Sequence, residues 1–265
     1  MFFERYGTGK RTYLGIHGWG ADHSVFAPLV AYLPSDASFF SADLPGCGRS
    51  RLPREWDLEE ILAEIIGTIV LINRGPVTIV GHCGGAIFGL FSARMSTRLI
   101  PRVVAIDPFA YMPRYFSVFM GERLGRRAYD STFANPLGRW LTNSVLNAGH
   151  GNQTDMVSTF NSTNHEVARR YLQLFSSIGG IDQLRGLQTT VDLVFGERTF
   201  SAVKKSVTQL SETLPFSRSL MLKGSRHLPL KEATEQLAQV IFEPGTDLNG
   251  YEEKKYVPVA TVRGF

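Results

Sequence analysis

Cysteine is scarce in this chain of 265 residues, which contains only Cys47 and Cys83. A small secreted protein that depends on disulfides needs more cysteines, so a disulfide scaffold is excluded. Long apolar runs are also missing: none approaches the roughly 18 residues of a membrane helix, and residues 1–6 lack the apolar core of a signal peptide. We therefore expect a soluble, cytoplasmic protein that has no membrane partner.

Blocks of one charge are absent as well. The 28 Lys and Arg residues exceed the 24 Asp and Glu residues only slightly, which gives a formal net charge of +4 and a pI of about 9.1. Because no basic helix with stacking aromatics accompanies this excess, we expect no nucleic-acid partner. A solvated surface explains the charge, and attraction to an acidic partner is the functional alternative.

The common metal and phosphate motifs are missing too. The sequence has no C-x-x-C, no H-E-x-x-H and no G-x-x-x-x-G-K, and the glycines around residue 83 lack the spacing of a dinucleotide fingerprint. We therefore predict neither a metal site nor a cofactor.

Strand and helix patterns alternate along the chain. Apolar runs predict strands, and apolar residues at helical spacing, for example in 58–72, predict helices. The predicted strands are 12–17, 38–43, 77–80, 102–107, 191–195 and 220–222. This alternation is typical of an α/β fold with a mostly parallel central sheet and helices on both faces. In such sheets, functional groups gather at the carboxyl ends of the strands.

One interruption of this alternation is too long for a plain loop. About 80 residues separate Asp107 from the strand at 191–195. Their apolar spacing predicts helices over 114–124, 135–146, 154–160 and 166–178. We interpret residues 110–187 as an inserted helical lid over a core formed by 1–109 and 188–243, with a C-terminal extension at 244–265.

The sequence VGHCGGA, residues 80–86, lies between a predicted strand and a predicted helix. Small residues at Gly81 and Gly85 permit a sharp turn that displays the side chain of Cys83. The start of the following helix favours an anion there, and hence a thiolate. A serine replaced by cysteine would leave the same pattern, and a buried, inert thiol is the structural alternative.

Four motifs, taken together, resemble those of the α/β-hydrolase fold superfamily. They are His17-Gly18-Trp19-Gly20, Asp43-Leu44-Pro45-Gly46-Cys47-Gly48, Gly81-His82-Cys83-Gly84-Gly85 and Gly224-Ser225-Arg226-His227. The resemblance covers nearly the whole chain. In its cysteine nucleophile the chain is similar to dienelactone hydrolases, polyhydroxyalkanoate synthases and some thioesterase-like domains.

The resemblance implies a Cys83-His227 pair, with His227 as the general base that follows the last strand. Many family members carry the triad acid after the penultimate strand, where this chain has Thr199. Asp107 ends the strand after the nucleophile helix, as in certain lipases, and is the predicted acid. Glu197 is the alternative, and the acid would hold the imidazole tautomer.

The same resemblance implies an oxyanion hole made by the backbone N–H groups of Trp19 and Gly84. We predict that the substrate pocket involves four further residues: His82, Phe109, Phe116 and Trp140.

A cysteine nucleophile suits activated acyl groups. The predicted function is therefore cleavage of an ester, thioester or lactone, with the acyl group passed to water or a small acceptor, as by a hydrolase or acyltransferase. The acyl group is carried, in this hypothesis, on coenzyme A or an acyl carrier protein. Two alternatives stay open: a lyase or C–C bond hydrolase on a polyketide-like substrate, and an inactive binding protein with a hydrolase fold.

Overall fold

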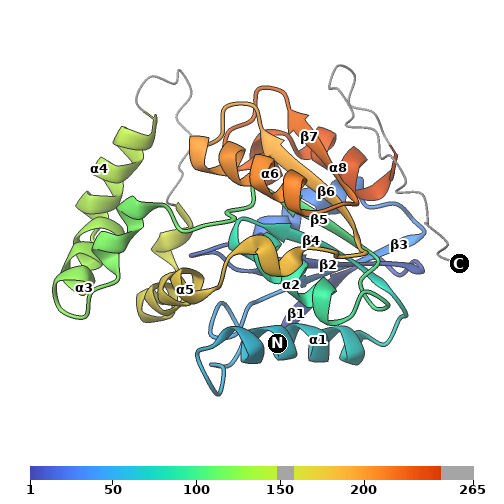
Figure 1. The fold of residues 1–265 in the computed structure, drawn as a ribbon, viewed down its shortest axis with the longest axis horizontal. Coiled ribbons are helices and arrows are strands. Elements are labelled where there is room, and N and C mark those ends of the chain that lie inside the picture. The colour runs from blue at the N-terminus through green and yellow to red at the C-terminus, as the bar shows by residue number, and fades with distance from the viewer. Residues whose placement is uncertain (148–157, 246–265) are drawn as a thin grey trace, which may run out of the picture.

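The computed structural model describes residues 1–147 and 158–245. Its centre is a seven-stranded sheet in the order β1-β3-β2-β4-β5-β6-β7. All neighbouring strands run parallel except β1, which pairs with β3 in the antiparallel sense. The predicted α/β fold with a mostly parallel sheet is confirmed (Figure 1).

The strands are β1 (Phe3–Tyr6), β2 (Arg11–Ile16), β3 (Ala37–Ala42), β4 (Val77–His82), β5 (Arg102–Ile106), β6 (Thr190–Gly196) and β7 (Ser217–Leu222). Each strand predicted from the sequence is present. The edge strand β1 was not predicted, because its half-exposed residues form no apolar run. The helices that pack on the sheet are η1 (His23–Tyr32), α1 (Leu58–Ile72), α2 (Gly84–Met95), α6 (Ser201–Thr213), α7 (Pro229–Glu232) and α8 (Thr234–Phe242).

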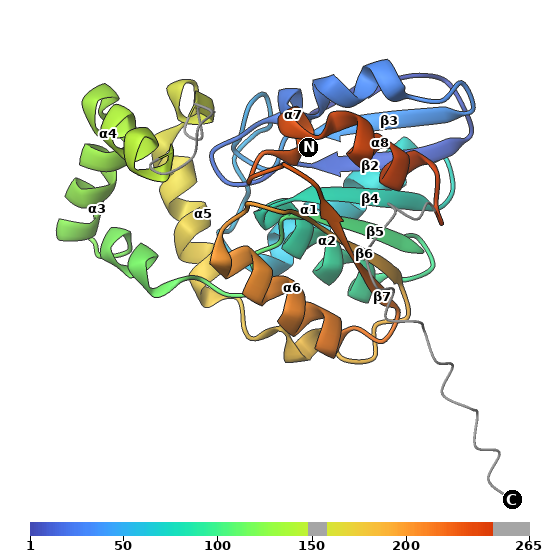
Figure 2. The same cartoon turned by 90° about the horizontal axis from the view of Figure 1, so that it is seen from above.

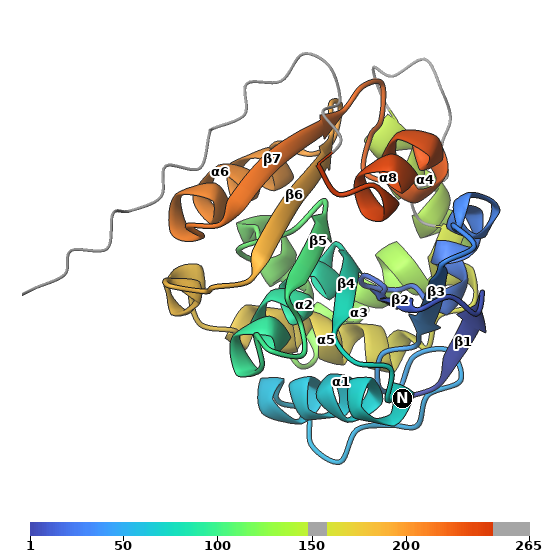
Figure 3. The same ribbon diagram turned by 90° about the vertical axis from the view of Figure 1, so that its right-hand side faces the viewer.

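Side chains that alternate along the strands fill two separate cores. Leu14 and Ile79 face a core shared with α1, α2 and α6, whereas Tyr13 and Val80 face a core shared with η1 and α8. Figure 3 shows α8 across the sheet from α1 and α2. Both faces are therefore covered, which explains why the central strands are almost uniformly apolar.

The segment between β5 and β6 is largely helical. Its helices are η2 (Arg114–Phe119), α3 (Leu124–Tyr129), η3 (Asp130–Ala134), α4 (Pro136–Asn147), η4 (Ser158–Asn161), α5 (His165–Ser177) and η5 (Ile181–Leu184). We call the part from Arg114 to Ser177 the helical lobe. Figures 1 and 2 show α3, α4 and α5 beside the sheet, off one end of its strands.

Two details of this segment differ from the sequence-based prediction. The single helix expected over 114–124 is a 3-10 turn, η2, followed by the separate helix α3. The helix expected over 154–160 falls partly outside the described residues, as does most of the extension predicted at 244–265. None of the helices within residues 1–147 and 158–245 is both long enough and apolar enough to cross a lipid bilayer.

Candidate active site

Cys83 occupies a sharp turn between β4 and α2. Its backbone has φ 53° and ψ −117°, a region that side-chain-bearing residues rarely adopt. The N–H of Cys83 donates to the carbonyl of Ile106 at 2.8 Å, which ties the turn to the end of β5. The thiol is therefore presented by strained backbone at the start of a helix.

The turn is possible because glycines surround it. A β-carbon on Gly85 would lie 2.1 Å from the carbonyl oxygen of Ile16, and one on Gly81 would lie 2.5 Å from the Cα of Ala86. A β-carbon on Gly18, in the loop after β2, would lie 2.7 Å from that of Cys83. The segments at Gly18, Gly81 and Gly85 therefore pack closely around the turn of Cys83. A larger residue at any of these positions would displace the turn.

His227 lies in the loop after β7 and contacts the residue that ends β5. Its Nδ1 donates to Oδ2 of Asp107 at 2.8 Å. Asp107 is fully buried, whereas 14% of the His227 side chain is exposed. The rings of Phe109 and Phe200 pack on the imidazole, with centroid distances of 5.5 and 4.9 Å. The structure thus brings together Asp107 and His227, which lie 120 residues apart in the sequence.

The turn after β6 completes the surroundings of Asp107. Thr199 donates its hydroxyl to Oδ2 at 2.5 Å, and the N–H of Gly196 donates to Oδ1 at 2.9 Å. Glu197, the alternative acid, instead accepts the N–H of Gly224. In the sequence, Thr199 marks only the absence of an acid after the penultimate strand, whereas in the structure its hydroxyl contacts the acid on the neighbouring strand.

The two histidines of the site differ in their pKa. Burial by itself lowers the pKa of His227, but its hydrogen bonds with Asp107 and Cys83, and the charges of both, raise the pKa to about 10. Burial, together with the nearby charge of His227, lowers the pKa of His82 to about 4. Nε2 of the neutral His82 ring lies 3.2 Å from the carbonyl oxygen of His227 and donates to it. Of these two histidines, His227 is therefore the one whose pKa favours the protonated, charged ring at neutral pH.

The two residues predicted to supply oxyanion donors, Trp19 and Gly84, line the same cavity as Cys83. Within the described part of the chain, the backbone N–H groups of Trp19 and Gly84 donate to no carbonyl oxygen. The buried ring of His17 holds the loop of Trp19: Nδ1 donates to the carbonyl of Gly18 at 2.8 Å, and Nε2 accepts from the N–H of Leu44.

A cavity of about 630 Å³ opens onto these residues. Cys83, His227, His82, Phe109 and Phe116 all line it, and most of its remaining wall is apolar. The structure does not place Trp140 with them.

Trp140 is 64% exposed, because α4 turns it away from the cavity together with three other apolar residues: Leu137, Leu141 and Val145. Its assignment to the pocket rested on residue type alone, which does not fix the direction in which a helix face points.

The side chain of Trp19 contacts the helical lobe, which no local sequence pattern predicts. Its indole Nε1 donates to the carbonyl of Ala168 at 2.7 Å, and its ring contacts Phe133 and Phe160 with centroid distances of 5.0 and 4.8 Å. These residues belong to a small aromatic core inside the helical lobe. The loop that presents a predicted oxyanion donor therefore also anchors the lobe.

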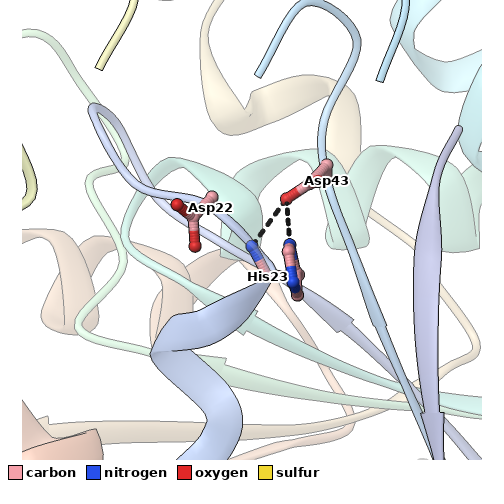
Figure 4. A group of neighbouring side chains, drawn as sticks. All are labelled: Asp22, His23 and Asp43. Carbon is pink, nitrogen blue, oxygen red and sulfur yellow. Dashed lines mark hydrogen bonds and ion pairs between the residues drawn. The ribbon is translucent and has the colours of Figure 1, made fainter. Parts of the chain in front are cut away.

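A second group of polar side chains lies between the start of η1 and the end of β3 (Figure 4). It consists of Asp22, His23 and Asp43. Asp43 is fully buried and accepts from both the backbone N–H and Nδ1 of His23, and from the N–H of Arg49. Asp22 caps η1 through the N–H of Ser24. Because internal donors already engage these carboxylates, the group serves to fix the turn after β3.

Several proteins that are similar in sequence to this chain are named as esterases. Two pimeloyl-[acyl-carrier protein] methyl ester esterases are similar to the chain. That of Sodalis glossinidius is 27% identical over 55% of this chain and 63% of its own length. That of Hamiltonella defensa is 21% identical over 89% of this chain and 93% of its own. The chain thus spans less than two thirds of the first of these relatives.

Solved structures share the fold. An esterase from Thermogutta terrifontis superposes with a TM-score of 0.74 at 18% identity, covering 91% of each chain. The sequence profile described as the alpha/beta hydrolase family matches residues 14–240, which is most of the chain. The protein therefore belongs to the alpha/beta hydrolase family.

Proposed function

We propose that the protein is a hydrolase of carboxylic esters or thioesters that uses Cys83 as its nucleophile. One observation carries the proposal: a strained cysteine and an imidazole line the same apolar cavity, and the imidazole is hydrogen-bonded to a buried carboxylate behind it. The raised pKa of His227, about 10, supports an imidazolium beside Cys83 and Asp107. Asp107 would stabilise that imidazolium and fix its orientation.

In the proposed reaction, the Cys83 thiolate forms a bond to the carbonyl carbon of the substrate. The carbonyl oxygen becomes an oxyanion that accepts from the N–H groups of Trp19 and Gly84. As the oxyanion collapses, the leaving alkoxide or thiolate takes the proton of His227. Water then attacks the thioester, its proton passes to His227, and Cys83 departs as thiolate with release of the carboxylic acid.

The helical lobe suits a role in substrate choice. Residues 110–187 form the lid in this proposal, because Phe116, Phe119 and Phe175 from this segment line the cavity. Their rings favour an apolar acyl chain or ring. The names of the relatives support a substrate attached to an acyl carrier protein, and coenzyme A esters present the same phosphopantetheine arm.

The test is capture of the acyl enzyme. The protein is mixed with p-nitrophenyl esters and acyl coenzyme A thioesters of the same acyl groups, and intact-mass spectrometry follows the covalent adduct. We expect one acyl group per chain in wild type and in Cys47→Ala, and none in Cys83→Ala. Turnover should fall at least about a thousandfold in Cys83→Ala, the scale of losing a triad nucleophile.

The matched cysteine variant makes the result specific. An adduct that persists in Cys83→Ala would assign the acyl group to another residue and reject the mechanism. Full turnover in Cys83→Ala that is lost in His227→Ala would favour the lyase or C–C hydrolase alternative. Absence of both adduct and turnover with every donor would favour the binding protein.

A further inference from the structure

We propose that Thr199 is a positioning residue, whose hydroxyl holds the carboxylate of Asp107 in the orientation that His227 requires. This inference rests on the proposed function, since it concerns the acid of the same site. It extends that function by giving a role to the turn after β6, which supplies no acid of its own to the imidazole.

The first support is that two donors share one oxygen. Oδ2 of Asp107 accepts from the Thr199 hydroxyl at 2.5 Å and from Nδ1 of His227 at 2.8 Å. Oδ1 accepts from the N–H of Gly196 at 2.9 Å. A carboxylate can rotate about its terminal torsion, and donors on both oxygens prevent that rotation.

The second support is the burial of this group. Asp107 has no exposed surface and Thr199 is 8% exposed, so solvent offers no substitute for a lost donor. The backbone holds the hydroxyl in place, because the N–H of Thr199 donates to the carbonyl of Gly196 at 3.1 Å. The backbone of Asp107 is equally fixed: its N–H donates to the carbonyl of Val194 at 2.8 Å, and its φ is 45°. Two neighbouring strand ends therefore orient one side chain.

Thr199 itself is absent from the wall of the cavity, so it acts through Asp107 and does not contact the substrate. Its loss should therefore lower kcat and leave KM unchanged. A residue needed only for folding would lower stability without changing the turnover of the folded protein. A residue that binds substrate would raise KM.

The experiment compares Thr199→Val, which keeps the shape and removes the hydroxyl, with Thr199→Ser, which keeps the hydroxyl. We expect kcat to fall about tenfold or more in Thr199→Val, the factor that corresponds to losing a hydrogen bond to a charged group. KM should change less than twofold. Thr199→Ser should recover kcat to within about threefold of wild type.

A second readout does not depend on turnover. The proton on Nδ1 of His227 gives a downfield NMR resonance whose position reports its hydrogen bond with Asp107. This resonance should shift or broaden in Thr199→Val and keep its wild-type position in Thr199→Ser. An unchanged resonance and unchanged kcat in a folded Thr199→Val protein would overturn the proposal.

The two readouts separate this inference from the proposed function. If Cys83→Ala keeps wild-type turnover, the proposed function fails, and the resonance still decides whether Thr199 orients Asp107 toward His227. If acyl capture at Cys83 succeeds while Thr199→Val behaves as wild type in both readouts, the proposed function stands and the positioning role is rejected.

Discussion

The end of the sheet and the helical lobe hold their side chains in different ways. At the sheet, Cys83 and Asp107 follow neighbouring strands, each at positive φ and each tied by a backbone hydrogen bond to the adjacent strand. In the lobe, a few aromatic rings pack around Trp19, and apolar residues such as Leu124 and Trp140 stay exposed. The first region is fixed by backbone and the second by side chains.

This difference assigns separate tasks to the two regions. Chemistry that depends on distances of about 3 Å suits positions that backbone geometry determines. Selection of an acyl group suits a wall of aromatic side chains, which adapt their packing at modest cost. Perturbations at the sheet should therefore abolish activity or unfold the whole domain, whereas perturbations in the lobe should act locally.

The largest effect is expected at the acid. Asp107→Asn should lower kcat by about four orders of magnitude, because the amide neither stabilises the imidazolium nor holds the imidazole tautomer that accepts the proton of water. Glu197→Gln is the matched control and should stay within a few-fold of wild type, since Glu197 caps the turn at Gly224. Steady-state hydrolysis of an activated ester measures both. The opposite pattern would make Glu197 the acid.

The next effect is a pH dependence of stability. The pKa of His227 rises from 6.5 to about 10 on folding, because its bonds with Asp107 and Cys83 outweigh burial. A group whose pKa is raised by folding stabilises the folded state fully below its unfolded pKa. The stability advantage of wild type over His227→Gln should thus be largest below pH 6.5 and shrink toward pH 10, as measured by urea denaturation. An advantage that grows with pH would contradict the pairing.

A core substitution in the sheet should destabilise the whole fold. Ile79 in β4 is fully buried, so Ile79→Ala should lower the free energy of unfolding by about 3 kcal/mol. Val70→Ala, at a site 62% exposed on α1, should change it by less than about 0.5 kcal/mol. Urea denaturation measures both, and equal effects at the two sites would show that the sheet does not dominate stability.

The same contrast explains what the sequence could predict. Cys83 and its glycines form one local motif, and the parallel order of the strands brings Asp107 to the same edge, so both were identified from sequence. The edge strand β1 was missed, because its residues form no apolar run. The α6 helix was missed although Ala202, Val203, Val207 and Leu210 are apolar at helical spacing.

Contacts that depend on strand register lay beyond sequence reasoning. The bond from Thr199 to Asp107 exists because β5 pairs with β6 with Ile106 opposite Val194, and no local pattern reveals that pairing. Likewise, the two aromatic residues of the lobe that were predicted to line the pocket, Phe116 and Trp140, were chosen by residue type. The direction of each ring depends on tertiary packing: Phe116 lines the cavity, whereas Trp140 is 64% exposed on α4.

Loss of the Trp19 ring should loosen the lobe while the sheet remains intact. Trp19→Ala removes contacts to Phe133 and Phe160 and the hydrogen bond to Ala168, at a local cost of about 3 kcal/mol. Hydrogen exchange should accelerate in α3 and η3, whose Tyr129 and Phe133 pack with Trp19, and stay unchanged in β4 and β5. Trp19→Phe, which keeps one aromatic ring and loses the indole donor, should show a smaller change. Uniform acceleration in all elements would mean that the lobe and the sheet unfold together.

The smallest effect is expected at Trp140, although it is the same residue type on the same lobe. Because its side chain is 64% exposed on α4, Trp140→Ser should change the free energy of unfolding by less than about 0.5 kcal/mol. It should also leave KM for small esters unchanged, since the ring is absent from the cavity wall. Urea denaturation and steady-state kinetics test both points. A rise in KM would mean that α4 turns toward the cavity when substrate binds. The helical lobe would then change its conformation on binding, although its aromatic core packs around Trp19.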